Sequence, residues 1–460
     1  MNSDQVVLKK DFCNSDFGDK RLNKRFEKIC AQFQQKPLAL INHVIQDAHQ
    51  CKAAYRFWIN PKVTTKKILE SHHKCLEDEL KREKVILEIQ DTTELDFSDH
   101  FKTENLGDLG NRKSRKKGLE CHSSIIVTEE GLCLGIGSMQ LWARKRLKNG
   151  KKDRRQIPLK DKESIKWLNA IDNFETAQIP NLLRITVADR EADFYELYDY
   201  INQNNQKMII RLRWDRKTTE RQSFKSEVLN QQIVGTTTIK TRARGGLNAR
   251  EEKETSISIR FVKKTILPPK NLKKEDIQNS NLTLTLIHVI EDSPREGEEP
   301  IEWYLLTNLE TEEFKNILQI IRWYSFRWLV EEFHKILKAG IGVESARLGT
   351  RQRLEKFITL LGVIAARILW MSRIGRIDPG GPSSLVITEE EEEFLIWKFP
   401  KKIVSNSLTI NESIRLIAML GGFLGRKSDK EPGLLTLWRG WMRFLDMMEG
   451  TQFKSSKRCG

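Results

Sequence analysis

Residues 323–338 (WYSFRWLVEEFHKILK) combine acidic, basic and aromatic side chains without Gly or Pro, which predicts a long helix. An α-helix turns about 100° per residue, so side chains at suitable spacing form a stripe along one face. Four residues of this stretch are predicted to share such a stripe: Tyr324, Arg327, Glu331 and Lys338. A single carboxylate among basic and aromatic groups can hold a metal ion beside a phosphate backbone. The alternative interpretation is an amphipathic helix with ion pairs between its own side chains.

The helix phase also predicts which neighbouring residues share the stripe with these four. Lys335 joins the stripe, whereas Glu332 points about 100° away from Glu331 and falls outside it. We therefore predict that Glu331, and not Glu332, is the acid that does chemistry. The other faces carry residues that can be buried: Trp328, Leu329, Phe333, Ile336 and Leu337.

Two more carboxylates follow apolar runs that predict buried strands. Asp91 interrupts the stretch 84–97 (KVILEIQDTTELDF), and Asp189 follows residues 182–188 (LLRITVA). An acid at the end of an apolar strand is usually a turn residue. Together with the single acid on the helix stripe, however, the two aspartates could form one metal site, and we predict that the three converge.

The composition favours an anionic partner. The chain has 460 residues and a formal charge of +16, from 79 Lys and Arg against 63 Asp and Glu. This length can hold three or four folded units, and nucleic acid is the leading candidate for the partner. A basic protein that is merely soluble is the alternative.

The cysteines and the apolar segments predict a soluble, cytoplasmic protein. Seven cysteines form no CxxC pair and no small-domain disulfide framework, which fits a reducing compartment. His72, His73 and Cys75 lack a second pair at zinc spacing and are expected to be solvated on a helix. The most apolar helical stretch, residues 357–371, contains Arg367 and is too short to span a bilayer.

Periodicity predicts helices at both ends of the chain and strands between them. Helices are expected at 19–33, 48–59, 164–174 and 407–424, with a break at 378–384. Residues 123–128 and 132–141 are predicted to form a hairpin, and the basic stretch 144–155 an exposed loop or phosphate-binding rim. Five further strands are expected at 207–214, 236–243, 255–262, 282–290 and 302–306.

The spacing Tyr-x2-Arg-x3-Glu-x6-Lys resembles the Y-R-E-K signature of hairpin-forming, cut-and-paste DDE transposases from bacterial insertion sequences. The segments Asp91-Thr-Thr and Asp189-Arg-Glu-Ala-Asp resemble the two aspartate motifs of the same family, and the likeness runs from about residue 17 to 448. It implies an α/β fold with an RNase H-like catalytic core at 71–375, interrupted by a β-rich insertion at about 205–310. A helical DNA-binding domain (1–70) and a helical dimerisation domain (376–460) would flank this core.

The resemblance also assigns roles to individual residues. Asp91, Asp189 and Glu331 would be the catalytic metal ligands, holding two Mg²⁺ ions about 4 Å apart, with Mn²⁺ as a substitute. Trp303 would stack on a base flipped out of the duplex. The residues that would contact DNA are Arg25, Arg211, Trp303, Tyr324, Arg327, Trp328, Lys335, Lys338 and Arg347.

The implied activity is cut-and-paste transposition. Each transposon end would be nicked, closed into a hairpin, reopened and joined to target DNA, with double-stranded terminal inverted repeats and target DNA as partners. A homodimer would pair through residues 438–448, although this Trp-rich segment could equally be core. The protein would act in the bacterial cytoplasm, on nucleoid DNA and without a membrane. The alternatives are another RNase H-like nuclease and a non-catalytic DNA-binding regulator derived from a transposase.

Overall fold

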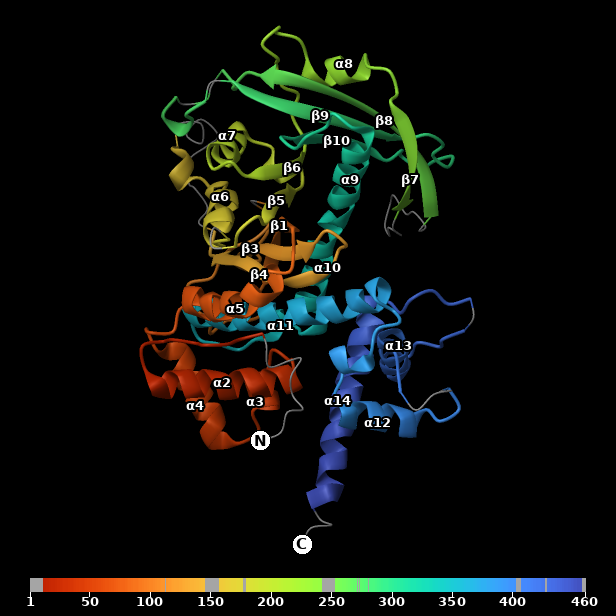
Figure 1. The fold of residues 1–460 in the computed structure, drawn as a ribbon. Coiled ribbons are helices and arrows are strands. Elements are labelled where there is room, and N and C mark those ends of the chain that lie inside the picture. The colour runs from red at the N-terminus through yellow and green to blue at the C-terminus, as the bar shows by residue number, and fades with distance from the viewer. Residues whose placement is uncertain are drawn as a thin grey trace.

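The computed structural model describes residues 11–111, 113–144, 157–176, 179–241, 253–270, 272, 274–279, 281–402, 407–426 and 428–456. Within them ten strands form one mixed sheet, with the order β2-β3-β1-β5-β6-β10-β9-β8-β7 and β4 paired to β3 (Figure 1). The strands are β1 (Val85–Asp96), β2 (Gly107–Asp108), β3 (Lys117–Thr128), β4 (Cys133–Trp142), β5 (Leu183–Ala188), β6 (Lys207–Arg211), β7 (Gly235–Thr241), β8 (Lys253–Ile266), β9 (Leu282–Glu291) and β10 (Glu302–Thr307). The predicted mixed α/β class is confirmed. The predicted basic loop lies outside the described residues from position 145 onwards.

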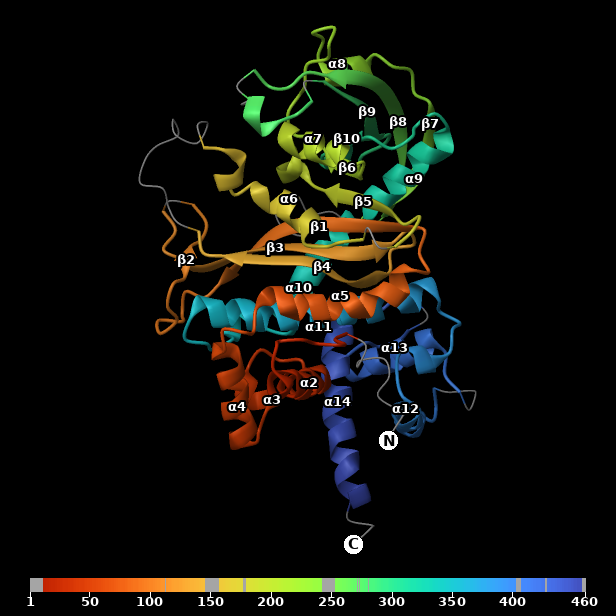
Figure 2. The ribbon, with the colours of Figure 1, turned by 60° about the vertical axis from the view of Figure 1, so that its left-hand side comes forward.

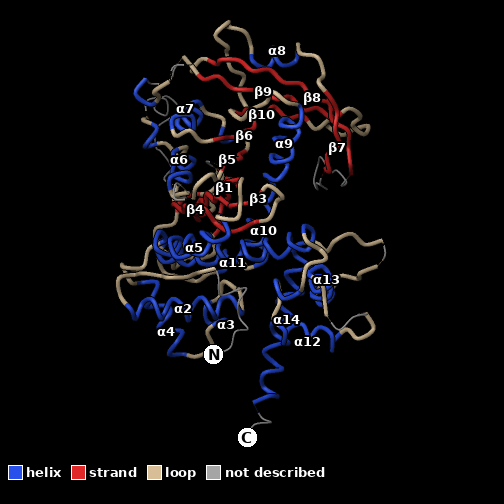
Figure 3. Tube along the Cα trace, in the orientation of Figure 1, coloured by secondary structure: helices blue, strands red, loops and turns tan. Residues whose placement is uncertain are grey.

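Helices cover the sheet and build both ends of the chain. The α-helices are α2 (Lys20–Gln35), α3 (Ile41–Val44), α4 (Ala48–Ile59), α5 (Thr65–Leu80), α6 (Ile165–Asp172), α7 (Tyr195–Gln203), α8 (Phe224–Leu229), α9 (Phe314–Ser325), α10 (Leu329–Lys335), α11 (Arg351–Ile377), α12 (Glu389–Lys398), α13 (Ile410–Leu420) and α14 (Leu434–Ser456). In two views, α5 and α11 lie together beneath β1, β3 and β4, with α2, α3 and α4 beyond them (Figures 1 and 2). The strands of the predicted insertion gather at the opposite end of the molecule (Figure 3).

Strand β1 is the centre of the sheet because its apolar residues face packed layers on both sides. It pairs antiparallel with β3 and parallel with β5, which explains why residues 86–90 are all buried. The prediction that the strand runs only as far as Asp91 is wrong, since β1 continues to Asp96. Its partner β3 is equally long, and the pairing persists to Asp96 and Gly118. Asp91 therefore lies within a strand and not at a turn.

The five later strands extend the same sheet. β6 pairs in parallel with β5, and β10, β9, β8 and β7 follow in antiparallel order. The predicted strand at 302–306 is thereby brought next to the strand at 207–211. Trp303, Tyr304 and Arg211 consequently lie on adjoining strands although about 90 positions separate them in the chain.

Helix α11 is longer than the sequence suggested. It spans 27 residues, so the prediction that its apolar stretch is too short to cross a bilayer is wrong. By length and composition this helix could cross a membrane, but 83% of its most apolar window is buried inside the protein. It packs against β4 and α5, as the central helix of a folded core does.

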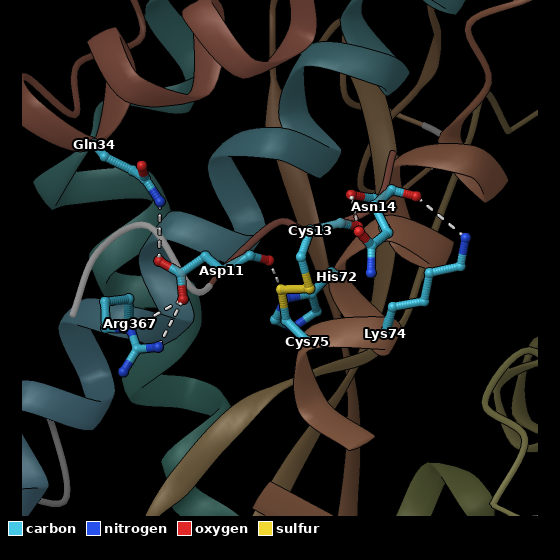
Figure 4. Close-up of a disulfide and its surroundings, with 9 residues drawn as sticks. Asp11, Cys13, Asn14, Gln34, His72, Lys74, Cys75 and Arg367 are labelled. Atoms are coloured by element: carbon cyan, nitrogen blue, oxygen red, sulfur yellow. Dashed lines mark hydrogen bonds and ion pairs between the residues drawn. A yellow bond between two sulfur atoms is a disulfide. The ribbon is translucent and has the colours of Figure 1, made fainter. Parts of the chain in front are cut away.

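The chain before α2 forms a strap across α5 and α11, which we define as residues 11–14. The carboxylate of Asp11 accepts hydrogen bonds from Arg367 at 2.9 Å, and Cys13 forms a disulfide with Cys75 (Figure 4). His72 is 1% exposed; its Nδ1 donates to the Asp11 carbonyl at 2.8 Å, and its Nε2 accepts from the Ile136 amide at 3.0 Å. Burial lowers the pKa of His72 to about 4. The prediction that His72, His73 and Cys75 are solvated is therefore wrong. The strap covers His72 and Cys75, and Nε2 of the half-buried His73 lies 3.2 Å from the Ile136 carbonyl.

The disulfide predicts a stability that depends on reduction. The bond closes a loop with a sequence separation of 62, and the loss of this constraint on the unfolded chain is expected to cost about 4 kcal/mol. Cys13→Ser should lower the midpoint of thermal unfolding, and a dithiol reductant should then have no further effect. Cys51→Ser, which changes a half-buried free thiol, is the matched control. Equal midpoints for wild type and Cys13→Ser would contradict a covalent strap.

The C-terminal helices form their own apolar cluster around α13 and α14. Trp438, Trp441 and Phe444 are all at most 5% exposed and pack inside the chain. These three side chains of the segment 438–448 therefore belong to the core, whereas Arg439, Arg443, Asp446 and Met447 are exposed. Beyond them α14 projects away from the body of the molecule (Figure 2).

Candidate active site

Two neighbouring parallel strands bring Asp91 and Asp189 to the same level of the sheet. Ile89 pairs with Val187 in the register of β1 and β5, and each aspartate lies two residues further along. Side chains two positions apart in a strand share a face, and neighbouring strands lie about 4.8 Å apart. Asp189 still has extended backbone angles, with φ −85° and ψ −166°. The two carboxylates thus lie on one face of the sheet.

The helical stretch reaches this face in four short pieces and not as one regular helix. α9 ends at Ser325, a 3₁₀ turn covers Phe326–Trp328, α10 follows, and a π-helical turn covers Ile336–Gly340. The prediction of a helix over 323–338 is confirmed, because the residues that join these pieces keep right-handed helical backbone angles. The uniform advance of about 100° per residue is wrong, because the 3₁₀ and π turns change it locally. The apolar side chains predicted to be buried do line the core: Leu329, Phe333, Ile336 and Leu337.

Helix α10 lies against β1 at the level of Asp91. Nδ1 of His334 is 3.9 Å from Oδ2 of Asp91, and Glu331 lies one helical turn before His334. Glu331 forms an ion pair with Arg327, one turn earlier, and its side chain is 56% exposed. The acid of the helix therefore faces the same region as the two aspartates and carries a basic partner.

The pKa of Asp91 is affected by the charges of the other two carboxylates. Burial raises the pKa of Asp91 to about 7; the amide of Thr92 opposes this rise, as does the Arg327 guanidinium, whereas the charges of Asp189 and Glu331 add to it. Two acids from distant sequence positions thus act on Asp91. A carboxylate that resists ionisation next to two others is one that a cation would stabilise.

The three carboxylates do not yet converge on a point. Among the residues that the structure describes, no group of three His, Cys, Asp or Glu side chains is arranged to hold a metal ion. Two of the acids have other partners, since Glu331 binds Arg327 and Oδ1 of Asp189 accepts from the Glu191 amide at 2.8 Å. The donor set is nonetheless all oxygen and anionic, which fits Mg²⁺ or Mn²⁺ once Glu331 exchanges Arg327 for the ion.

Contacts of Asp189 and Asp193 hold the segment that follows β5 in place. Asp189 caps a 3₁₀ turn, Arg190–Ala192, and Ala192 is buried beneath it. The carboxylate of Asp193 is buried, binds the guanidinium of Arg216, and accepts the Tyr198 hydroxyl at 2.5 Å. These contacts fix the position of the loop that carries Asp189.

A basic and aromatic cluster adjoins the acids. Trp303 packs edge-on against Tyr324, with ring centroids 5.2 Å apart, and Arg211 donates to the carbonyl of Glu302 at 2.8 Å. The Tyr324 hydroxyl is buried and has no hydrogen-bond partner among the described residues. Burial raises the pKa of Tyr324, and the guanidinium groups of Arg327 and Arg211 oppose this rise. Four predicted DNA contacts thus meet beside Asp189.

The other residues that were predicted to contact DNA lie further from this cluster. Lys338 donates to the Glu94 carbonyl at 2.9 Å, and Arg347 to the Asp99 carbonyl at 3.4 Å, so both lie near the far end of β1. Trp328 lies under the guanidinium of Arg373, 5.6 Å from the ring centroid. The exposed Lys335 lies on α10, and Arg25 lies on α2, away from these elements.

Two histidines near the acids were missed by the sequence analysis. His334 is 6% exposed, and burial lowers its pKa to about 3. His122 is fully buried between β1 and α6, and burial also lowers its pKa. His334 lies three residues after Glu331, so the helical spacing alone could have indicated it. His122 gave no such signal, because its position depends on the pairing of β1 with β3.

Three family models match separate parts of the chain. A transposase DNA-binding domain matches residues 5–63, a transposase DDE domain matches 168–368, and a transposase Tn5 dimerisation domain matches 363–459. The DDE match includes Asp189 and Glu331, whereas Asp91 precedes it. Together the matches support a DNA transposase that binds DNA and forms homodimers, and the DDE domain implies an RNase H-like core.

Proposed function

We propose that this protein is a cut-and-paste DNA transposase in which Asp91, Asp189 and Glu331 form the catalytic site. The observation that carries the proposal is the placement of these three acids on β1, at the end of β5 and on α10, where the charges of Asp189 and Glu331 add to the raised pKa of Asp91. The match to a DDE domain gives the reaction class. The proposed substrates are double-stranded terminal inverted repeats and target DNA, in the bacterial cytoplasm.

The three carboxylates would hold divalent cations, Mg²⁺ or Mn²⁺, which activate the attacking oxygen and stabilise the leaving oxygen of a phosphodiester. Asp91 and Asp189 would supply two positions of the site, since the register of β1 and β5 brings them to the same level of the sheet. Glu331 completes it from α10 when Arg327 is released. The guanidinium of Arg327 is then available to bind a DNA phosphate.

The basic and aromatic cluster would hold the distorted DNA end. We assign Tyr324, Arg327, Lys335 and Lys338 to its phosphates, and Trp303 to a base that leaves the stack. The proposed order of steps is nicking, hairpin formation, hairpin opening and strand transfer. A homodimer would bridge the two transposon ends.

A cleavage assay on labelled transposon ends tests the function. With Mg²⁺, a hairpin product is expected, and removal of the ion with a chelator should abolish every product while leaving end binding. Nicked DNA alone would indicate an RNase H-like nuclease instead. Binding without any cleavage would indicate a regulator derived from a transposase.

Trp303 provides a separate test of hairpin formation. Stacking on a flipped base contributes about 1–3 kcal/mol, so Trp303→Ala is expected to slow hairpin formation about 10-fold or more and to spare first-strand nicking. An abasic site at the flipped position should partly rescue the variant. Trp303→Phe, which keeps a ring against Tyr324, is the matched control. Unfolding of Trp303→Ala, measured by thermal denaturation, would instead assign this residue to the core.

A further inference from the structure

His122 forms hydrogen bonds to strand β1 on both sides of Asp91. Its Nδ1 lies 2.9 Å from Oγ1 of Thr92, and its Nε2 lies 3.2 Å from Oε1 of Gln90. Because an amide oxygen only accepts, Nε2 carries the hydrogen and the Thr92 hydroxyl donates to Nδ1. The backbone amide of Thr92 in turn donates to Asp91 at 2.9 Å. The imidazole thus holds the two neighbours of Asp91 in the strand.

Lys166 reaches the loop of the other aspartate. Its side chain is 6% exposed, and its ammonium group lies 2.5 Å from Oε1 of Glu191. The amide of Glu191 donates to Oδ1 of Asp189 at 2.8 Å. The next residue of α6, Trp167, packs edge-on against His122 with ring centroids 4.6 Å apart. Two adjacent helical residues are therefore linked to the aspartate-bearing segments, Lys166 directly through Glu191 and Trp167 indirectly through His122 of β3.

This connection matters because strand pairing alone does not fix Asp189. The last β1–β5 pair is Ile89 with Val187, so both aspartates lie beyond the ladder that joins their strands. Asp91 pairs with Ser123 of β3, and Asp189 directly follows the pair Ala188–Ile210, so side-chain contacts add to these ladders in setting the separation of the two carboxylates. A buried ammonium group is a costly choice for packing alone, since an apolar side chain of similar volume is often as stable or more stable.

We infer that Lys166 and Trp167 form a brace, through Glu191 and His122, that sets the spacing of Asp91 and Asp189 for metal binding. Lys166 is a positioning residue in this scheme, since it contacts neither the ion nor the DNA. The inference rests on the proposed metal site and adds residues to it. The brace and simple electrostatics predict opposite effects of removing Lys166 on the affinity for a cation. Removal of a nearby positive charge would by itself strengthen the binding of a cation, whereas loss of the brace weakens it.

Titration of the metal-free, full-length protein with Mn²⁺ alone, with free Mn²⁺ followed by electron paramagnetic resonance, tests the brace. Lys166→Met is expected to weaken Mn²⁺ binding about 10-fold, the lower end of the effect of removing outer partners of metal ligands. Glu191→Gln should give a similar loss, and the double variant should be no worse than either single one. Lys166→Arg, which can still reach Glu191, should restore most of the affinity.

Matched controls separate this inference from the proposed function. Lys162→Met removes a neighbouring lysine that pairs with Glu196 at 3.6 Å, and it should bind Mn²⁺ like wild type. Asp189→Asn should lose the site. Unchanged or tighter Mn²⁺ binding in both Lys166→Met and Glu191→Gln would overturn the brace while the metal site stands. Equal binding by wild type and Asp189→Asn would overturn the metal site itself, and the brace with it. If Lys166→Met fails to fold, Lys166→Gln decides the question, because it keeps a polar group beside Glu191 while electrostatics alone predicts tighter Mn²⁺ binding for it.

Discussion

Glu331→Gln is expected to reduce metal-dependent cleavage of transposon ends by more than about 100-fold and to leave end binding within a few fold of wild type. Loss of an outer partner of a metal ligand already costs about 10–100-fold, so loss of a ligand should cost more. Glu331 lies one turn before His334, which contacts the Asp91 side chain, and its charge acts on Asp91. Single-turnover cleavage and a gel-shift assay measure the two quantities.

Glu332→Gln is the matched control, because it removes the same charge from the adjacent position. We expect cleavage within about fivefold of wild type. Loss of an outer partner of a metal ligand costs at least about 10-fold, and Glu332 is predicted to be neither a ligand nor an outer partner. The reverse ranking of the two variants would show that α10 presents its other carboxylate to the site. Loss of DNA binding in Glu331→Gln would instead assign the residue to the DNA interface.

The parts of the fold that depend on local pattern were predictable from the sequence. The second strand of the hairpin around Gly131 and the strand before Asp189 have the expected bounds within one residue, whereas the first strand of the hairpin begins six residues before its predicted start. Asp19 caps α2 at the predicted start, where its side chain accepts from the Arg21 amide. Such features are set by neighbouring residues, through turn chemistry, capping and periodicity.

The parts that were not predictable depend on partners far away in the chain. Asp91 lies inside β1 because β3 continues the pairing past it, and Cys75 is covered because the strap crosses α5. The irregular turns around α10 likewise have no local breaker residue, since Gly340 is the first glycine in the stretch. Helix phase still selected Glu331, because Arg327 and Glu331 are joined within four residues and short separations tolerate such irregularity.

Asp91→Asn is expected to stabilise the metal-free protein, and increasingly so as the pH rises. The pKa of Asp91 is raised from 3.8 to about 7 in the folded protein, and burial is the largest cause. Between these two values the folded protein holds a proton that the unfolded chain has released, so the free energy of unfolding falls as the pH rises. At 1.36 kcal/mol per pH unit, this loss amounts to at most about 4 kcal/mol by pH 8.

Chemical denaturation of wild type and Asp91→Asn at pH 4, 6 and 8 measures the effect. The asparagine lacks the titrating group, so the difference in free energy of unfolding should be small at pH 4 and grow through pH 7. Saturating Mg²⁺ at pH 8 should then stabilise wild type and leave Asp91→Asn nearly unchanged, because the cation compensates the ionised carboxylate. A difference that does not vary with pH would mean that Asp91 titrates as an ordinary aspartate. In that case neither burial nor the charges of Asp189 and Glu331 raise the pKa of Asp91.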